Sequence, residues 1–154
     1  MSNMKNLITL ALLLCLPLLC YAPESDFGKI SNITAAACLL YNVERSHIDA
    51  LFAEESGFHN IRTWEPRIKK YAHGPGQILY NTAKDVGYKG PERGLDDINI
   101  SIPLKVKFVK KLWKRYKGNW SMICSHYKTG KARYAKYGKA HDKMYQEFLK
   151  ANCS

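Results

Sequence analysis

Hydrophobic residues recur at helical spacing along most of the chain, after an uninterrupted apolar start. The apolar run covers residues 7–22, and Lys5 is the only charged side chain before it. Residues 34–42 are apolar and alanine-rich, and residues 46–56 place several large apolar side chains on one helical face. Both stretches predict helices, and residues 23–33 read as a polar lead-in to the first of them.

The second half of the chain continues this pattern. Four further stretches combine apolar spacing with residues suited to begin or end a helix: 76–86, 102–116, 119–127 and 131–150. Three further residues suit helix ends: Ser46 and Asn119 as starts and Gly57 as a stop. Residues 57–75 read as a long loop and the other connections as turns, and Pro103 fits the first turn of its helix. No run reads as a strand, so the pattern predicts one mainly α domain over residues 34–152.

The first 22 residues have the layout of a secretory signal. A short basic start leads into an apolar stretch that is shorter than the roughly 20 residues of a comfortable membrane span. Pro23 directly after Ala22 disfavours cleavage at that point. The sequence therefore predicts export, periplasmic or extracellular, with residues 1–22 as either a cleaved signal peptide or a retained signal anchor.

Charge and composition narrow the class of partner. The net charge is +11, and from Asn99 onward only Asp142 and Glu147 are acidic. Such a field favours an anionic partner, and export makes an anionic wall polymer a better candidate than nucleic acid. The five histidines do not have the spacing that is typical of metal ligands, so neither a metal nor another cofactor is expected.

Three cysteines follow the apolar start: Cys38, Cys124 and Cys153. In an oxidising compartment one pair of them could close, but the sequence does not choose the pair. No C-x-x-C motif is present, so a redox motif or a cysteine zinc site is not indicated.

Two adjacent acids stand at the end of the helix over residues 46–56. Glu55 is four residues from Leu51 and three from Phe52, so it borders the apolar face, whereas Glu54 drifts off it. A carboxyl half inside an apolar cleft is held as the acid near neutral pH, and such an acid can protonate a glycosidic oxygen. By helical spacing alone, two glutamates on a helix are more often ordinary surface residues.

Three blocks in order resemble the lysozyme-like domain of the soluble lytic transglycosylases, distantly related to goose-type lysozyme. Residues 53–58 (AEESGF) resemble the family's glutamate-serine motif, and residues 74–78 (GPGQI) resemble its Gly-Leu-Met-Gln-Ile block. Residues 126–130 (HYKTG) resemble its Ala-Tyr-Asn-Ala-Gly block. The chain departs from these blocks at Pro75 and Gly76, where the wall of the groove loses side chains, and at Lys128, which adds charge near the cleft.

The resemblance implies a site and a reaction. Glu55 corresponds to the acid/base, while Ser56, Gln77 and Tyr127 correspond to substrate-binding residues. The substrate would be peptidoglycan, cut between N-acetylmuramic acid (MurNAc) and N-acetylglucosamine (GlcNAc) with formation of 1,6-anhydro-MurNAc ends. A second carboxyl is not convincing, because Asp96 and Asp97 read as turn or helix-capping residues.

Other functions stay open at this point. A hydrolytic lysozyme would use the same glutamate on the same bond, with a positioned water instead of the sugar hydroxyl. A protein of another class would keep the fold and bind the wall or a polyanion without catalysis.

Overall fold

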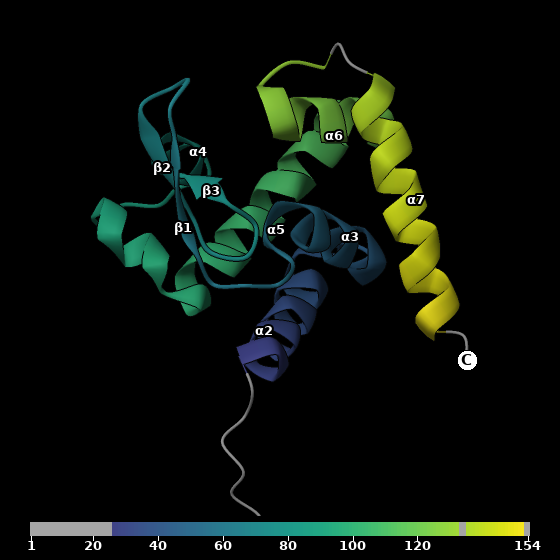
Figure 1. Cartoon of the computed structure of the whole chain (residues 1–154), viewed down its shortest axis with the longest axis horizontal. Helices are drawn as coiled ribbons and strands as arrows, with labels where there is room; N and C mark the ends of the chain where they lie inside the picture. Colours follow the sequence, from purple (N-terminus) through teal and green to yellow (C-terminus); the bar gives the residue numbers. More distant parts are fainter. Residues whose placement is uncertain (1–25, 133–134, 153–154) are drawn as a thin grey trace, which may run out of the picture.

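Helices make up most of the computed structural model, which describes residues 26–132 and 135–152 (Figure 1). The helices are α2 (Asp26–Tyr41), α3 (Arg45–Ser56), α4 (Tyr80–Asp85), α5 (Ile98–Arg115), α6 (Trp120–Thr129) and α7 (Ala135–Asn152). A 3₁₀ helix, η2 (Glu92–Asp96), precedes α5, and three short strands form one sheet: β1 (Arg62–Glu65), β2 (Lys70–His73) and β3 (Ile78–Leu79). The mainly α class predicted from the sequence is confirmed.

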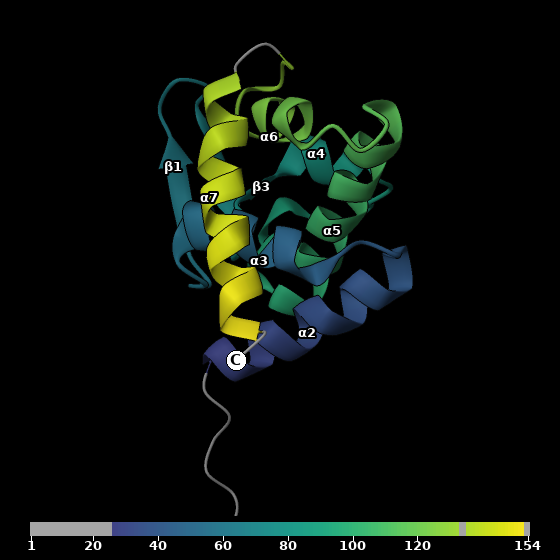
Figure 2. The ribbon, with the colours of Figure 1, turned by 90° about the vertical axis from the view of Figure 1, so that its right-hand side faces the viewer.

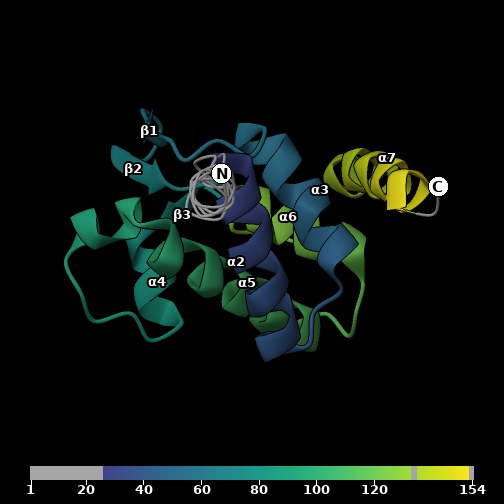
Figure 3. The same cartoon turned by 90° about the horizontal axis from the view of Figure 1, so that it is seen from below.

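The helix α5 runs through the middle of the molecule and contacts α2, α4 and α6. The small sheet lies at one end, and α7 lies at the opposite end against α3 and α6 (Figures 1 and 3). In a view from the side of α7, that helix covers α3 (Figure 2). Buried apolar side chains of α2, α3, α5 and α6 form the main core, with Leu51, Phe52, Ile102 and Val106 among its fully buried members.

Several helix ends lie where local sequence signals place them. Gly57 takes a left-handed conformation after α3, and its N–H bonds to Ala53 O. The side chain of Asn119 accepts from Met122 N at the start of α6, as predicted. The start of α5 differs, because Asp97 caps it and the helix begins four residues before Ile102, which places Pro103 inside the helix rather than in its first turn.

The starts of the first two described helices also differ from the sequence prediction. Residues 26–33, expected as lead-in, belong to α2, where Ile30 and Thr34 are buried. Ser46 does not cap α3, which begins at Arg45, and Glu44 at the N-cap position makes no side-chain cap bond. α2 packs on α5 and α3, and Ile30, which lies before the apolar stretch, is part of the buried core.

The expected loop over residues 57–75 contains a β-hairpin instead. β1 and β2 pair antiparallel, with Arg62 opposite His73 and Glu65 opposite Lys70, and β2 pairs in turn with β3. The strands are four, four and two residues long, too short for a pattern of alternation to stand out in the sequence. The helix predicted over residues 76–86 is correspondingly shortened to α4.

The signal peptide or signal anchor predicted over residues 1–22 and the position of Cys153 lie outside the described residues. None of the described helices has the length and apolar character needed to cross a membrane. Cys38 and Cys124 are both free, buried thiols. Burial, helped by nearby acidic groups, raises the pKa of each thiol to about 12, which suppresses the thiolate that disulfide exchange requires.

A pair of buried histidines joins α7 to α3. His47 Nδ1 and His141 Nε2 are 2.9 Å apart, and the His47 ring stacks between Trp120 and Tyr145 at centroid distances of 3.7 and 4.0 Å. Burial is the main cause that lowers the pKa of His47 from 6.5 to about 3 and that of His141 to about 4. Both rings are therefore neutral in the folded protein near neutral pH, and only one of the facing nitrogens can carry a proton.

We expect His141 to make the fold sensitive to acid. Below pH 6.5 the unfolded imidazole takes up a proton that the folded imidazole takes up only near pH 4, so the free energy of unfolding falls as the pH falls through this window. Between pH 7 and pH 4, the wild type should lose about 3 kcal/mol more than His141→Gln in chemical denaturation. His59→Gln, at an exposed histidine, is the matched control and should behave as wild type. An equal loss in wild type and His141→Gln would contradict this assignment.

Candidate functional site

Two carboxylates at the end of α3 share one lysine. Glu54 and Glu55 have side chains 15% and 17% exposed, so the two are buried to nearly the same degree. Lys128 Nζ, from α6, lies 2.8 Å from Glu55 Oε1 and 3.4 Å from Glu54 Oε2. The predicted position of Glu54 off the apolar face does not leave it exposed, because α7 packs against α3 and Lys128 of α6 contacts both carboxylates.

Residues 74–77, named here the 74–77 loop, face this end of α3 and are held by their backbone carbonyls. Gly74 O accepts from the side-chain amide of Gln77 (2.9 Å), and Pro75 O accepts from Ser56 Oγ (2.8 Å). Gly76 O accepts from the Tyr127 hydroxyl (2.9 Å), and Gln77 O accepts from Lys105 Nζ (3.4 Å). Four consecutive carbonyls are thus bound by side chains, which come from α3, α5, α6 and the loop itself.

The absence of a side chain at Gly76 is required by two neighbours. A Cβ atom at this position would lie 2.6 Å from Phe52 Cε1 and 2.7 Å from Lys105 Cγ. These separations are far below van der Waals contact, so Phe52 and Lys105 occupy the space where the family pattern has a side chain. The expectation that this wall has simply lost side chains is therefore incomplete, since residues from α3 and α5 replace them.

Lys105 is a buried cation beside the same loop. It is 5% exposed, and its ammonium lies 3.7 Å from the centre of the Tyr127 ring, a favourable cation–π position. Burial lowers the pKa of Lys105 from 10.5 to about 8; Glu55 opposes this shift and Lys128 adds to it. Two ammonium groups and two carboxylates therefore interact in one partly buried region.

The structure brings all four predicted site residues together, but three of them bond to backbone. Ser56, Gln77 and Tyr127 each donate to a carbonyl of the 74–77 loop, and Gln77 itself has a left-handed backbone, with φ of +49°. Burial and the neighbouring acidic groups raise the pKa of Tyr127 well above its usual value, so its hydroxyl stays a donor. These three side chains shape the wall beside Glu55.

The two aspartates considered as a second carboxyl are engaged elsewhere. Asp96 Oδ1 lies 2.7 Å from His73 Nδ1, and Asp96 Oδ2 lies 3.7 Å from Arg62. Asp97 caps α5 by accepting from Asn99 N at 2.8 Å. The reading of these residues as structural fits both positions.

The sequence analysis did not single out Lys105 or the partnership of Glu54 with Lys128. A signal for Lys105 existed, because it lies three residues after Ile102 and four before Val109, on the apolar stripe of α5. A charged residue on such a stripe is unusual unless it has a partner. The burial of Glu54 has no comparable local signal, since it depends on how α6 and α7 pack.

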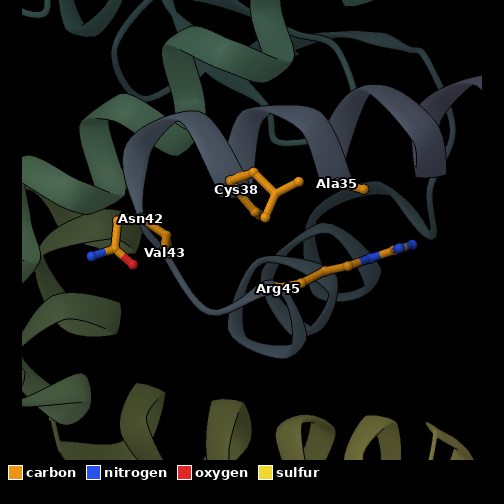
Figure 4. A pocket seen from close by; sticks show the side chains of 6 residues that line it. Ala35, Cys38, Asn42, Val43 and Arg45 are labelled. Carbon is orange, nitrogen blue, oxygen red and sulfur yellow. The ribbon is translucent and has the colours of Figure 1, made fainter.

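A hollow lies at the end of α3 opposite to Glu55. A recess of about 340 Å³ is lined by α2 and by the link to α3, with Cys38, Leu39, Val43 and Arg45 among its walls (Figure 4). Arg45 is ten residues before Glu55, which at the helical rise separates the two by roughly 15 Å. The recess is therefore separate from the carboxylates. Within the described residues, no group of three or more His, Cys, Asp or Glu side chains is placed to hold a metal ion.

The burial of Lys105 predicts an unusual stability profile. Between pH 8 and pH 10.5 the unfolded lysine keeps a proton that the folded lysine has lost, so folding stability from this residue rises with pH. Between pH 7 and pH 10, wild type should gain roughly 2 to 3 kcal/mol over Lys105→Met in denaturant titrations. Lys107→Met, at an exposed position of the same helix, should leave the profile unchanged. Parallel profiles for wild type and Lys105→Met would show that Lys105 is not titrating as a buried group.

Comparisons with known proteins identify the fold and the family of the chain. A solved structure of an inactive mutant of the lytic transglycosylase Slt from Pseudomonas aeruginosa superposes with a TM-score of 0.59 at 16% identity, which shows a shared lysozyme-like fold. The match covers 75% of this chain but only 21% of the Pseudomonas chain. No curated protein matches at the level of sequence. Residues 32–148 match the family described as the transglycosylase SLT domain, and the chain belongs to this family.

Proposed function

We propose that this protein is a lytic transglycosylase that cleaves peptidoglycan between MurNAc and GlcNAc and leaves 1,6-anhydro-MurNAc ends. The observation that carries the proposal is the position of Glu55. It ends α3 in a partly buried place, faced by the 74–77 loop and by the residues that anchor this loop. Membership in the transglycosylase SLT domain family supports the same reaction class.

In the proposed reaction one carboxyl group acts first as the acid and then as the base. Glu55, as the acid, protonates the oxygen that links MurNAc to GlcNAc, and the bond from this oxygen to the anomeric carbon breaks. The N-acetyl oxygen of MurNAc stabilises the anomeric centre. Glu55, now a carboxylate, takes the proton of the MurNAc 6-hydroxyl, whose oxygen bonds to the anomeric carbon and closes the anhydro ring. No water is consumed.

Ser56, Gln77 and Tyr127 contribute by fixing the wall of the site. Their bonds to the 74–77 loop hold its backbone facing Glu55, so a glycan strand meets a rigid surface. The original expectation that these side chains touch substrate directly stays a prediction, and it requires that their polar atoms also reach the sugar.

A hydrolytic lysozyme is the nearest alternative function. It would need a group that positions water across the bond, and most such enzymes use a second carboxyl. Asp96 and Asp97, the candidates from the sequence, are bound to His73 and to the first turn of α5. Their engagement favours intramolecular transfer. A non-catalytic wall-binding or polyanion-binding protein is the alternative of another class.

We further propose that the protein acts outside the cytoplasm, in the periplasm or beyond, and that its positive charge draws it to anionic wall polymers. The net charge of +11 and the basic second half of the chain support an anionic partner over a neutral one. Residues 7–22 are the proposed export or anchoring segment.

Purified peptidoglycan tests the reaction. Wild type should release soluble fragments whose mass spectra carry the anhydro ring, and Glu55→Gln should lose at least about 100-fold in rate, because general acid–base catalysis contributes about 10² to 10⁴. Glu147→Gln, at an exposed glutamate of α7, is the control and should keep full activity. Products that lack the anhydro ring would establish a lysozyme instead. Lytic activity that survives in Glu55→Gln would exclude the catalytic assignment, and no activity in wild type would favour the binding protein.

A further inference from the structure

The shared lysine poses a problem for the proposed chemistry. Glu55 has to turn an oxygen toward a glycosidic bond, yet Glu55 Oε1 is held by Lys128 Nζ at 2.8 Å. While this ion pair is closed, Oε1 faces the ammonium, and only the other oxygen of Glu55 is left to meet a substrate. Lys128 itself is only 21% exposed, so the pair is partly shielded from water and from screening salt.

Lys128 cannot free Glu55 by giving up its own charge near neutral pH. Burial opposes the ammonium, but the two carboxylates outweigh this cost and raise the pKa of Lys128 above its usual value. The lysine therefore stays positive, and Glu55 Oε1 is released only if the ammonium moves. A flexible four-carbon stem makes such a movement possible without a change in the helices.

Glu54 is the acceptor to which the ammonium can move. Within the described part of the chain, Glu54 Oε1 is buried and has no hydrogen-bond partner, and Glu54 Oε2 holds Lys128 only at 3.4 Å. A buried acceptor without a partner is costly, so a closer approach of Lys128 would satisfy Glu54. In this arrangement one oxygen of Glu54 has no partner, whereas Glu55 Oε1 holds the ammonium at 2.8 Å.

Movement in the other direction is disfavoured. Lys105 lies on the side of Tyr127 and the 74–77 loop, and the mutual repulsion of the two ammonium groups contributes to the lowered pKa of Lys105. A shift of Lys128 toward that side would bring like charges together in a partly buried place. Full exit to solvent would leave Glu54 and Glu55 adjacent without this counter-ion.

We propose that Lys128 is a mobile counter-ion that pairs with Glu55 in the free protein and moves onto Glu54 when a glycan engages Glu55. The inference rests on the proposed function of Glu55 and adds two positioning residues to it. Once Lys128 has moved, Glu55 takes a proton from solvent and presents it to the glycosidic oxygen. Glu54 keeps the ammonium during the reaction, so the pair of carboxylates is never left without a cation.

A double-variant cycle tests this role with peptidoglycan as substrate. Glu54→Gln removes the negative charge that would receive the ammonium, so Lys128 stays on Glu55. The value of kcat should fall at least about tenfold while KM changes little, because general acid catalysis contributes about 10² to 10⁴. Lys128→Asn added to Glu54→Gln removes the ammonium itself. The double variant should therefore recover most of the lost kcat.

A merely structural role of Glu54 predicts the opposite result. The two changes would then add, and the double variant would be as slow as Glu54→Gln or slower. Equal kcat in wild type and Glu54→Gln would also overturn the proposal. Glu54→Ala, which removes the unpartnered oxygen, serves as a second form of the test if thermal melting shows that Glu54→Gln does not fold. Glu147→Gln is the charge-matched control.

The proposed function and this inference fail in different ways. If wild type releases no fragments, or if Glu55→Gln remains active, the proposed function fails, and the mobile counter-ion fails with it because it depends on Glu55 as the acid. The other case is that wild type is active and Glu55→Gln is inactive. In that case, if kcat of Glu54→Gln equals that of wild type, or if the double variant does not recover kcat, only the mobile counter-ion proposal is wrong.

Discussion

The anchoring of four consecutive carbonyls in the 74–77 loop is the constraint on which the arrangement of the site depends. The donors come from the loop and from three helices, so the loop ties the end of α3 to α5 and α6. Each bond alone contributes modestly, about 1 kcal/mol in a typical protein. Together they fix a short glycine-containing loop that would otherwise be free to move. A rigid wall opposite Glu55 is what a positioned acid requires.

Gly76 makes this convergence possible. Because it has no Cβ, Phe52 from α3 and the stem of Lys105 from α5 both reach the loop backbone. Phe52 thereby joins the main core to the wall of the site, and Lys105 brings a charge into it. A departure from the family pattern at one small residue is thus linked to a buried lysine 29 positions later, on another element.

The site holds two carboxylates and two ammonium groups, so its positive and negative charges are equal in number. Glu54 and Glu55 stand on α3, Lys105 on α5 and Lys128 on α6. Since no described aspartate joins them, their state depends on one another more than on the rest of the protein. In the third block, Lys128 stands where the family pattern has a neutral side chain. It is a direct partner of the proposed acid. This substitution alters the immediate surroundings of Glu55 without displacing Glu55 from the helix end.

The sequence by itself determined the mainly helical class, several helix ends and the order of the three blocks around Glu55, Gln77 and Tyr127. These features are local, because an N-cap such as Asn119 or a left-handed stop such as Gly57 acts within one turn of its helix. Tertiary structure alone decided the hairpin, whose short strands depend on pairing between distant residues, and the length of α2, which depends on packing. It also decided that Glu54 is as buried as Glu55 and that Lys105 lies beside Tyr127. Burial and ion pairing are set by which elements meet, and the spacing of residues along one helix does not contain that information.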